Sequence, residues 1–315
     1  MTDTRAKFLD FMRHVLSGAP DFIEPGKLQR FSTNGRRGDT AGWCKLFEDG
    51  RGGVFGCHRQ GIFEVWSAVD RRAMSAAELA QFQRQVQASR AEREREQRQR
   101  WAQNAERVHA LWAECEPLLP GDSATLYLKR RGLGGMWPLP DCLRFHPRLG
   151  YWADGQQIGL FPAMVSAITS PEGELVALHR TYLTQGGRKA PVPTVKKLTA
   201  AAGPLAGACI ALAKPSRGVL GISEGIETGL AAGLASGLPV VAAYSASNLA
   251  QWIWPSDVRR IVVFADNDKA GLDAADTLRA RALRADLRCE VHSPSDAGVD
   301  WCDVWAAGQS VGVQA

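Results

Sequence analysis

Acidic residues recur at three places in the C-terminal third of the chain, and their types and spacing could serve chemistry at a phosphate. These residues are Glu224, Glu227, Asp266, Asp268, Asp300 and Asp303. Carboxylates that converge repel one another and resist ionisation unless a cation lies between them. Mg²⁺, or Mn²⁺ in its place, prefers oxygen ligands and bridges one or two carboxylates to the phosphates of a substrate. The pattern therefore predicts a divalent-cation site whose chemistry is displacement at phosphorus.

Alternating strands and helices would bring these acidic groups together. Apolar runs typical of buried strands are Val219–Ser223, Val240–Tyr244, Ile261–Ala265 and Leu287–His292, and helices are expected at residues 226–236, 249–254, 272–285 and 301–307. This alternation predicts an α/β fold with a parallel, doubly wound sheet. Ligands bind beyond the carboxyl ends of parallel strands, so Glu224 would meet Asp266 and Asp268 at one edge. Asp300 and Asp303 would join them from a third connection.

Each acidic residue also has an ordinary structural interpretation. Asp266-Asn267-Asp268 could be a simple turn, because Asp and Asn side chains bond their own backbone. Glu227, in a first helical turn, could complement the helix dipole, and Asp300 or Asp303 could cap a helix. Their placement after successive strands is the observation that favours a shared metal site.

The composition divides the 315 residues into four parts. Residues 1–70 combine an amphipathic helix with short strands and turn signals, and predict a small α+β module. Residues 71–116 lack internal Gly and Pro and predict a long Arg/Glu-rich helix, either a solvated connector or an arm that contacts phosphates. Residues 117–218 form a subdomain with a helix end near Gly132 and strands at 160–168, 175–183 and 209–213. Residues 219–315 contain the parallel sheet.

The bulk composition permits a nucleic-acid partner without requiring one. The 38 basic and 33 acidic residues give a net charge of +5, and a local basic patch matters more than this total. The seven Cys, an odd number with no CxxC spacing, argue against a disulfide framework and indicate a reduced, cytoplasmic protein. The uncharged run 228–256 is broken by Gly237 and Pro239, so we expect no membrane helix.

Several basic residues are candidates for contacts with nucleic acid or nucleotide. They are Arg180, Lys189, Lys196, Lys197 and Lys269. Lysine and arginine in loops can reach backbone phosphates. Solubilising surface charge is an equally good interpretation of the loop residues, and the sequence does not decide between the two.

Three segments resemble the signature motifs of the Toprim domain: Gly221–Thr228, Val263–Gly271 and Val299–Val304. They are most similar to the Toprim DNA primases of plasmids, phages and other mobile elements. The resemblance extends upstream to Leu178–Leu183 and, more weakly, to Phe31–Gly35. It implies that Glu224 is the general acid or base, that Asp266 and Asp268 bind metal, and that Asp300, with Asp303 nearby, is the third acidic position.

The sequence departs from replicative bacterial primases in two ways. Their glutamate motif has an aspartate where this chain has Thr228, and Glu227 is the candidate to replace it at a second metal. Their N-terminal zinc ribbon would have only Cys44, Cys57 and His58 to build on, so we expect no zinc site. Some relatives in mobile elements fuse primase to helicase; this chain has no GxxxxGK[ST] loop, so we expect it to recruit a separate helicase or to work without one.

The resemblance implies a DNA primase-type nucleotidyltransferase that makes short RNA primers on single-stranded DNA from NTPs with Mg²⁺. Two other classes remain open. A Toprim nuclease would use similar metals to cleave DNA or RNA phosphodiesters, and a non-catalytic Toprim adaptor would bind DNA without turnover.

Overall fold

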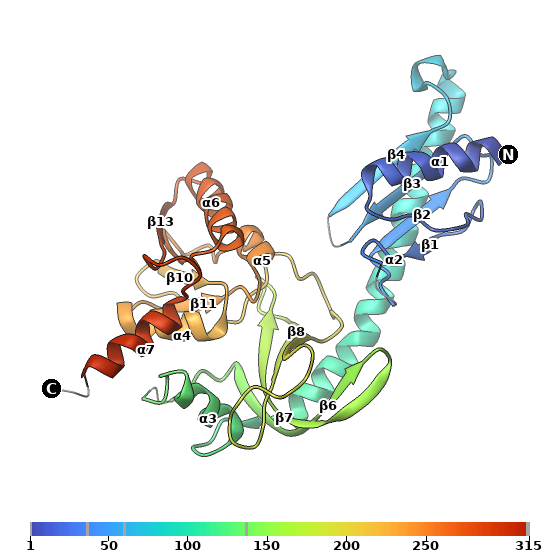
Figure 1. The fold of residues 1–315 in the computed structure, drawn as a ribbon. Coiled ribbons are helices and arrows are strands. Elements are labelled where there is room, and N and C mark those ends of the chain that lie inside the picture. Colours follow the sequence, from blue (N-terminus) through green and yellow to red (C-terminus); the bar gives the residue numbers. More distant parts are fainter. Residues whose placement is uncertain (1, 36–37, 59–60, 136–137, 313–315) are drawn as a thin grey trace. The chain divides into compact units, whose positions relative to one another are not determined.

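The computed structural model describes residues 2–35, 38–58, 61–135 and 138–312 (Figure 1). Its internal contacts divide the chain into two units, residues 1–99 and 100–315. Helix α2 (Ala76–Glu114) contributes its first part to unit 1 and its last turns to unit 2. The long helix predicted from the absence of Gly and Pro is thus present.

Unit 1 is an antiparallel sheet with a helix on each face. Helix α1 (Thr2–Val15) precedes the strands β1 (Gln29–Phe31), β2 (Gly42–Leu46), β3 (Gly52–Cys57) and β4 (Ile62–Ser67), and a short turn of 3-10 helix (Arg71–Ala73) follows them. Phe8 and Met12 of α1 are fully buried, and the Phe8 ring packs edge-on against Phe55. On the other face Phe82 of α2 packs against Phe47. This is the small α+β module that the alternating pattern predicted.

The cysteines of unit 1 belong to its apolar core. Cys44 and Cys57 are buried among the residues that α1 covers. Burial raises the pKa of the Cys44 thiol to about 12, so this thiol stays protonated. The Sγ of Cys57 lies 3.4 Å from the Thr33 hydroxyl, and the His58 Nε2 lies 3.0 Å from an Arg30 Nη. Cys57 and His58 thus contact neighbouring side chains within unit 1.

The first layer of unit 2 is a five-stranded antiparallel sheet in the order β5-β6-β7-β8-β9. The strands are β5 (Glu116–Pro117), β6 (Leu143–Ala153), β7 (Gln156–Thr169), β8 (Leu175–Tyr182) and β9 (Lys196–Leu198). Val108 and Leu111 of α2 pack on one face, and helix α3 (Ser123–Arg130) packs on the other. The strand expected at residues 209–213 is absent, because Cys209 and Ile210 form only isolated bridges.

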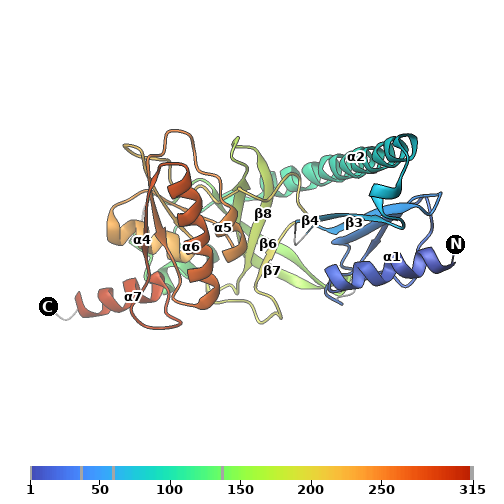
Figure 2. The ribbon, with the colours of Figure 1, turned by 90° about the horizontal axis from the view of Figure 1, so that it is seen from above.

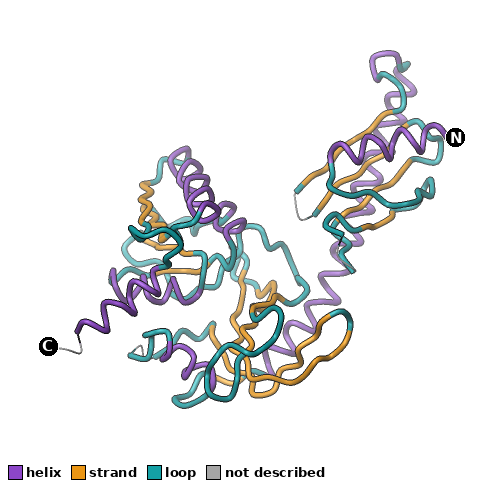
Figure 3. The backbone as a smooth tube through the Cα atoms, in the orientation of Figure 1, coloured by secondary structure: helices purple, strands orange, loops and turns teal. Residues whose placement is uncertain are grey.

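The second layer of unit 2 is the parallel sheet, in the order β11-β10-β12-β13. Figure 2 shows this part of the chain from above. Its elements are β10 (Val219–Ser223), α4 (Ile226–Ser236), β11 (Val240–Ala242), α5 (Ala246–Gln251), β12 (Arg260–Phe264), α6 (Lys269–Arg284), β13 (Arg288–His292) and α7 (Trp301–Gly312). Figure 3 shows how helix and strand alternate along this part. Helices α5 and α6 pack on one face, and α4 and α7 on the other. The predicted doubly wound sheet is confirmed.

The register of the parallel sheet aligns the ends of its strands. Ser223 at the end of β10 pairs with Phe264 at the end of β12, and Phe264 pairs with His292 of β13. The residues that follow these strands therefore emerge at one edge, as expected for a site beyond the carboxyl ends. The two layers share one core, in which Leu128 of α3 and Ile226 of α4 are both buried.

A tight loop between β8 and β9 holds α3 in place and gives a testable stability prediction. Gly187 adopts a φ of +67°, and a Cβ there would fall 2.6 Å from the backbone nitrogen of Tyr127. The Ser123 hydroxyl and the Arg130 Nε donate to carbonyls of the same loop. Gly187→Ala should therefore lower the free energy of unfolding by about 1–3 kcal/mol, measured by urea denaturation.

The neighbouring Gly186 is the control for this prediction. A Cβ on Gly186 would meet open space, so Gly186→Ala should change the stability little. Equal effects of the two substitutions would show that α3 does not depend on the close approach at Gly187.

Within the described residues no helix is long and apolar enough to cross a membrane. The uncharged run 228–256 is divided among α4, β11 and α5, as its Gly and Pro residues suggested.

Candidate metal and catalytic site

Three carboxylates stand at the aligned edge of the parallel sheet. Glu224 directly follows β10, and Asp266 stands two residues after β12. Asp268 is the N-cap of α6, and its side chain accepts a hydrogen bond of 2.8 Å from the backbone N–H of Gly271. The ends of two strands and the start of one helix thus fix the positions of the three residues. None of the three carboxylates forms an ion pair with another described residue.

The pKa values of this group show that the carboxylates lie within electrostatic reach of one another. Burial, followed by the charges of Glu224, Asp300 and Asp268, raises the pKa of Asp266 to about 6, against a small opposing effect of the Thr228 hydroxyl. Burial and the charge of Asp268 also raise the pKa of Glu224. The mutual repulsion inferred from the sequence is therefore present in the folded chain.

This group of oxygens suits a divalent cation. The buried Oδ1 of Asp266 has no hydrogen-bond partner, and a cation would satisfy both that atom and the neighbouring negative charge. Among the described residues, no group of three or more acidic, His or Cys side chains is arranged so that it could hold a metal ion on its own. Mg²⁺ commonly binds through one or two carboxylates and keeps its waters, so Asp266 and Asp268 would be the side chains that hold it.

The repulsion at Asp266 predicts a change in stability when its charge is removed. Its pKa rises from 3.8 to about 6 on folding, so its contribution to stability is largest below about pH 4 and is lost as the pH rises through 6. Asp266→Asn should therefore stabilise the chain in EDTA at pH 7.5 by about 1 kcal/mol, a value reduced for partial solvent exposure. At pH 4 the variant and the unaltered chain should be equally stable in urea unfolding.

Asp276 provides the comparison for this measurement, because it is exposed on α6 and carries the same side chain. Asp276→Asn should give no difference between the two pH values. If Asp266→Asn also gives none, the carboxylates are not repelling one another in the folded state.

The third acidic segment meets a basic side chain. Asp300 caps α7, because its Oδ1 accepts 2.8 Å from the backbone N–H of Asp303. The guanidinium of Arg131, which follows α3, lies 3.3 Å from Asp300 and 3.3 Å from Asp303. The capping role considered from the sequence is thus real, and Asp300 also contributes to the raised pKa of Asp266.

Glu227 is engaged by two neighbours from the preceding subdomain. Its Oε1 accepts 2.6 Å from the Tyr127 hydroxyl, and its Oε2 accepts 2.8 Å from the Lys196 ammonium. Burial alone would raise the pKa of Glu227, but the charge of Lys196 and these hydrogen bonds outweigh it and hold the pKa at about 2. The carboxylate is therefore ionised and paired at neutral pH.

The five basic candidates are not brought together. Lys196 lies on the face of the antiparallel sheet that meets α4, as its contact with Glu227 requires. Arg180 and Lys197 lie on the opposite face, where Arg180 donates to the Leu198 carbonyl and Lys197 lies over the Tyr151 ring. The two remaining side chains are exposed: Lys189 in the β8–β9 connection and Lys269, which pairs with Asp273.

Two residues of this region were not found from the sequence. Tyr127 and Arg131 stand one helical turn apart at the end of α3, yet they contact residues 100 and 169 positions further along the chain. No motif marks either residue, and their helix has an ordinary amphipathic pattern. Only the fold reveals that one helix end supplies partners to two acidic segments.

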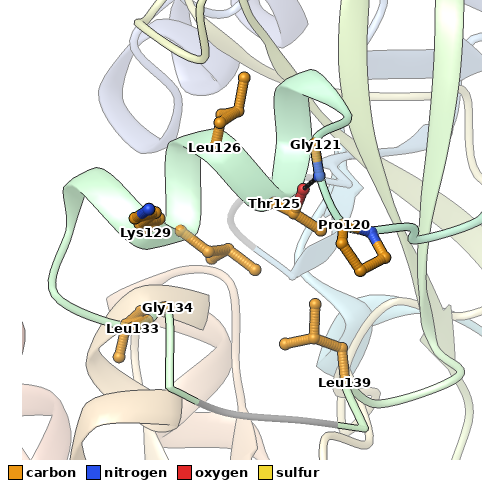
Figure 4. Close-up of a pocket in the computed structure, with 9 residues that line it drawn as sticks. Pro120, Gly121, Thr125, Leu126, Lys129, Leu133, Gly134 and Leu139 are labelled. Carbon is orange, nitrogen blue, oxygen red and sulfur yellow. Dashed lines mark hydrogen bonds between the residues drawn. The ribbon is translucent and has the colours of Figure 1, made fainter.

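A pocket of about 440 Å³ lies beside α3 (Figure 4). Leu126, Leu133 and Leu139 form much of its wall, and the Thr125 hydroxyl accepts a hydrogen bond from the Gly121 N–H at its rim. None of the described residues that line it is acidic, so it does not extend the cation site.

Two segments of unit 2 match known domain families. Residues 219–310 match the Toprim domain, and residues 102–211 match a domain of unknown function, DUF7146. No curated protein matches the chain in sequence. The Toprim match spans all three acidic segments, so the resemblance noted from the motifs is confirmed for this part of the chain.

Among solved structures, the chain is similar to several primases. The Aquifex aeolicus primase with its zinc-binding and RNA polymerase domains is 14% identical over 99% of this chain and 83% of that chain, with a TM-score of 0.44. A DnaG primase catalytic domain bound to ssDNA is 14% identical over 70% and 81%, with a TM-score of 0.43. The primase fragment of the bacteriophage T7 primase-helicase is 14% identical over 60% and 67%, with a TM-score of 0.37.

The similarity to two other bacterial primase structures covers a smaller share of their length. The chain spans 55% of a Pseudomonas aeruginosa primase domain and 58% of a Mycobacterium tuberculosis RNA polymerase domain. All these values describe a distant likeness of fold.

Proposed function

We propose that this chain, which carries a Toprim domain in residues 219–310, is a DNA primase-type nucleotidyltransferase. Its substrates would be NTPs and a single-stranded DNA template, and its product a short RNA primer. The observation that carries the proposal is the placement of Glu224, Asp266 and Asp268 at one edge of the parallel sheet, with the pKa of Asp266 raised to about 6 by burial and by its acidic neighbours. Such a group matches the needs of metal-assisted transfer at phosphorus.

Each residue of the group would have a separate task in the transfer. Glu224 would take the proton of the primer 3′-hydroxyl as its oxygen bonds to the α-phosphorus and the bond to pyrophosphate breaks. Asp266 and Asp268 would hold the divalent cation. When bound, Mg²⁺ would offset the negative charge that develops on the phosphoryl oxygens. Asp300, held by Arg131, would keep the third acidic segment close without adding an unpaired charge.

The partners follow from this reaction. A template strand needs a basic path and stacking surfaces, and the exposed Lys189 and Lys269 are candidates for phosphate contacts. These 315 residues contain no phosphate-binding loop of the helicase type, and a replicative helicase is a further candidate partner.

One assay tests the proposal. The full chain is incubated with a single-stranded oligonucleotide, α-³²P-labelled NTPs and Mg²⁺, and the products are separated on a denaturing gel. Short labelled RNA that disappears when the template is omitted is the expected result. A shortened oligonucleotide would instead identify a nuclease, and template binding without any product would identify an adaptor.

A further inference from the structure

We infer that Glu227 does not ligate a metal but is a positioning residue, which together with Tyr127 holds the Lys196 ammonium beside the carboxylate edge. In this role Lys196 would meet the phosphates of the incoming nucleoside triphosphate, so this part of the inference rests on the proposed function. The inference assigns a different task to the glutamate that the motif comparison offered as a replacement ligand.

Both carboxylate oxygens of Glu227 already accept a hydrogen bond. The Tyr127 hydroxyl donates to Oε1 at 2.6 Å, and the Lys196 ammonium donates to Oε2 at 2.8 Å. The side chain is buried, with 4% of the residue exposed. The three partners come from α3, β9 and α4, so the carboxylate joins three elements of unit 2 at one point.

Moving Glu227 to a cation would break both hydrogen bonds at once. The buried Tyr127 hydroxyl would lose its acceptor, and Lys196 would lose the only carboxylate with which it pairs among the described residues. An uncompensated buried group is costly, so the paired arrangement opposes ligation. Thr228 stands where the primase motif has an aspartate, and its hydrogen bond with Asp266 lowers the pKa of Asp266.

The neighbouring His179 does not compete with Lys196 for the Glu227 carboxylate. His179 lies close enough to influence both charges, but burial, followed by the charge of Lys196, lowers the pKa of His179 to about 4. This imidazole is neutral at pH 7 and carries no charge that could attract the carboxylate. Lys196 is thus the one positive partner of Glu227 within the described residues.

The ammonium of Lys196 remains able to bind an anion. It has three N–H donors, and the contact with Glu227 uses one of them. Its side chain is 41% exposed, and its charge lowers the pKa of Glu224, which places it near the carboxylate edge. A lysine fixed in this way loses little conformational freedom when a phosphate arrives.

The first test measures metal binding alone and does not depend on catalysis. Mn²⁺ is titrated into the metal-free full chain, and free Mn²⁺ is followed by EPR. Glu227→Gln should keep the Mn²⁺ affinity within about twofold, like the control Glu290→Gln, which removes a paired carboxylate on β13, whereas Asp266→Asn should weaken it at least about tenfold. If Glu227→Gln weakens Mn²⁺ binding as much as Asp266→Asn does, Glu227 is a ligand and the inference falls.

The second test asks whether the pair acts on the nucleotide. Lys196→Met and Glu227→Gln should each raise the KM for ATP in primer synthesis about tenfold with kcat within a few-fold, because charge-assisted hydrogen bonds are lost. The double variant should be no worse than Lys196→Met, since one interaction is removed in both. Tyr127→Phe, which keeps the ring in the core, should raise the KM by a smaller factor.

A purely structural ion pair predicts a different outcome. The variants would then lower the unfolding midpoint and leave the KM unchanged, which would overturn the positioning role. If the unaltered chain makes no primers, the proposed function fails, and ATP binding by calorimetry replaces the KM. Weaker ATP binding by Lys196→Met and Glu227→Gln, with unchanged Mn²⁺ affinity, would still support the inference, and unchanged ATP binding would refute it.

Discussion

Asp266→Ala should lower the rate of primer synthesis at least about a thousandfold. The affinity of the variant for a single-stranded oligonucleotide should stay within a few-fold of that of the unaltered chain. The substitution removes the carboxylate with a buried, unpartnered oxygen and so removes the main reason for a cation to bind at this edge. Template binding should depend on basic and aromatic surfaces elsewhere, and so should persist. Labelled primer yield and fluorescence anisotropy of the oligonucleotide measure the two properties.

The control for this variant is Asp276→Ala, which truncates an exposed aspartate on α6. It should leave both primer yield and template affinity unchanged. Normal primer synthesis by Asp266→Ala would remove the assignment of the cation site, and loss of template binding as well would point to a disturbed fold.

Glu224→Gln should lower kcat by about 10²–10⁴-fold and change the Mn²⁺ affinity only a few-fold. Glutamine has nearly the same shape but cannot accept the proton of the attacking hydroxyl, whereas Asp266 and Asp268 remain to hold the cation. Single-turnover primer extension with a preformed primer measures the chemical step. Equal losses of kcat and Mn²⁺ affinity would make Glu224 a ligand rather than a base.

The pH dependence of the same reaction provides an independent check on Glu224. Burial and the charge of Asp268 raise the pKa of this carboxyl above its ordinary value of 4.5. A base must be ionised to accept a proton, so kcat should fall as the pH decreases, beginning at a higher pH than an exposed glutamate would give. Glu224→Gln should abolish this acidic limb, and Glu290→Gln should retain it.

The parallel sheet could be predicted because its signals are local. Val219–Ser223 and the helix that ends before Gly237 were placed at the residues where they occur, since apolar runs and a left-handed glycine act over short distances. Strand β6 was missed, because Pro147 and charged residues interrupt its apolar pattern. Cys209 and Ile210 have the composition of a strand but bridge two different sheets.

The partners of the acidic residues could not be predicted, because they depend on distant contacts. Tyr127 and Lys196 come from two elements that precede the parallel sheet, and nothing in their local sequence names Glu227 as their partner. The face of the sheet on which Arg180 and Lys197 lie could not be predicted either, because it depends on the register of the strands. Composition indicated basic residues without indicating the side of the sheet on which each would lie.

The end of α3 has a consequence for anyone who wishes to prepare a minimal catalytic fragment. A truncated chain beginning at residue 219 would contain the complete Toprim match but would lack Tyr127 and Arg131. Glu227 would lose both hydrogen-bond donors, and Ile226 would lose its packing against the neighbouring layer. A fragment cut at the start of the Toprim match would therefore be prone to aggregate. The shortest fragment that folds stably should start near residue 100.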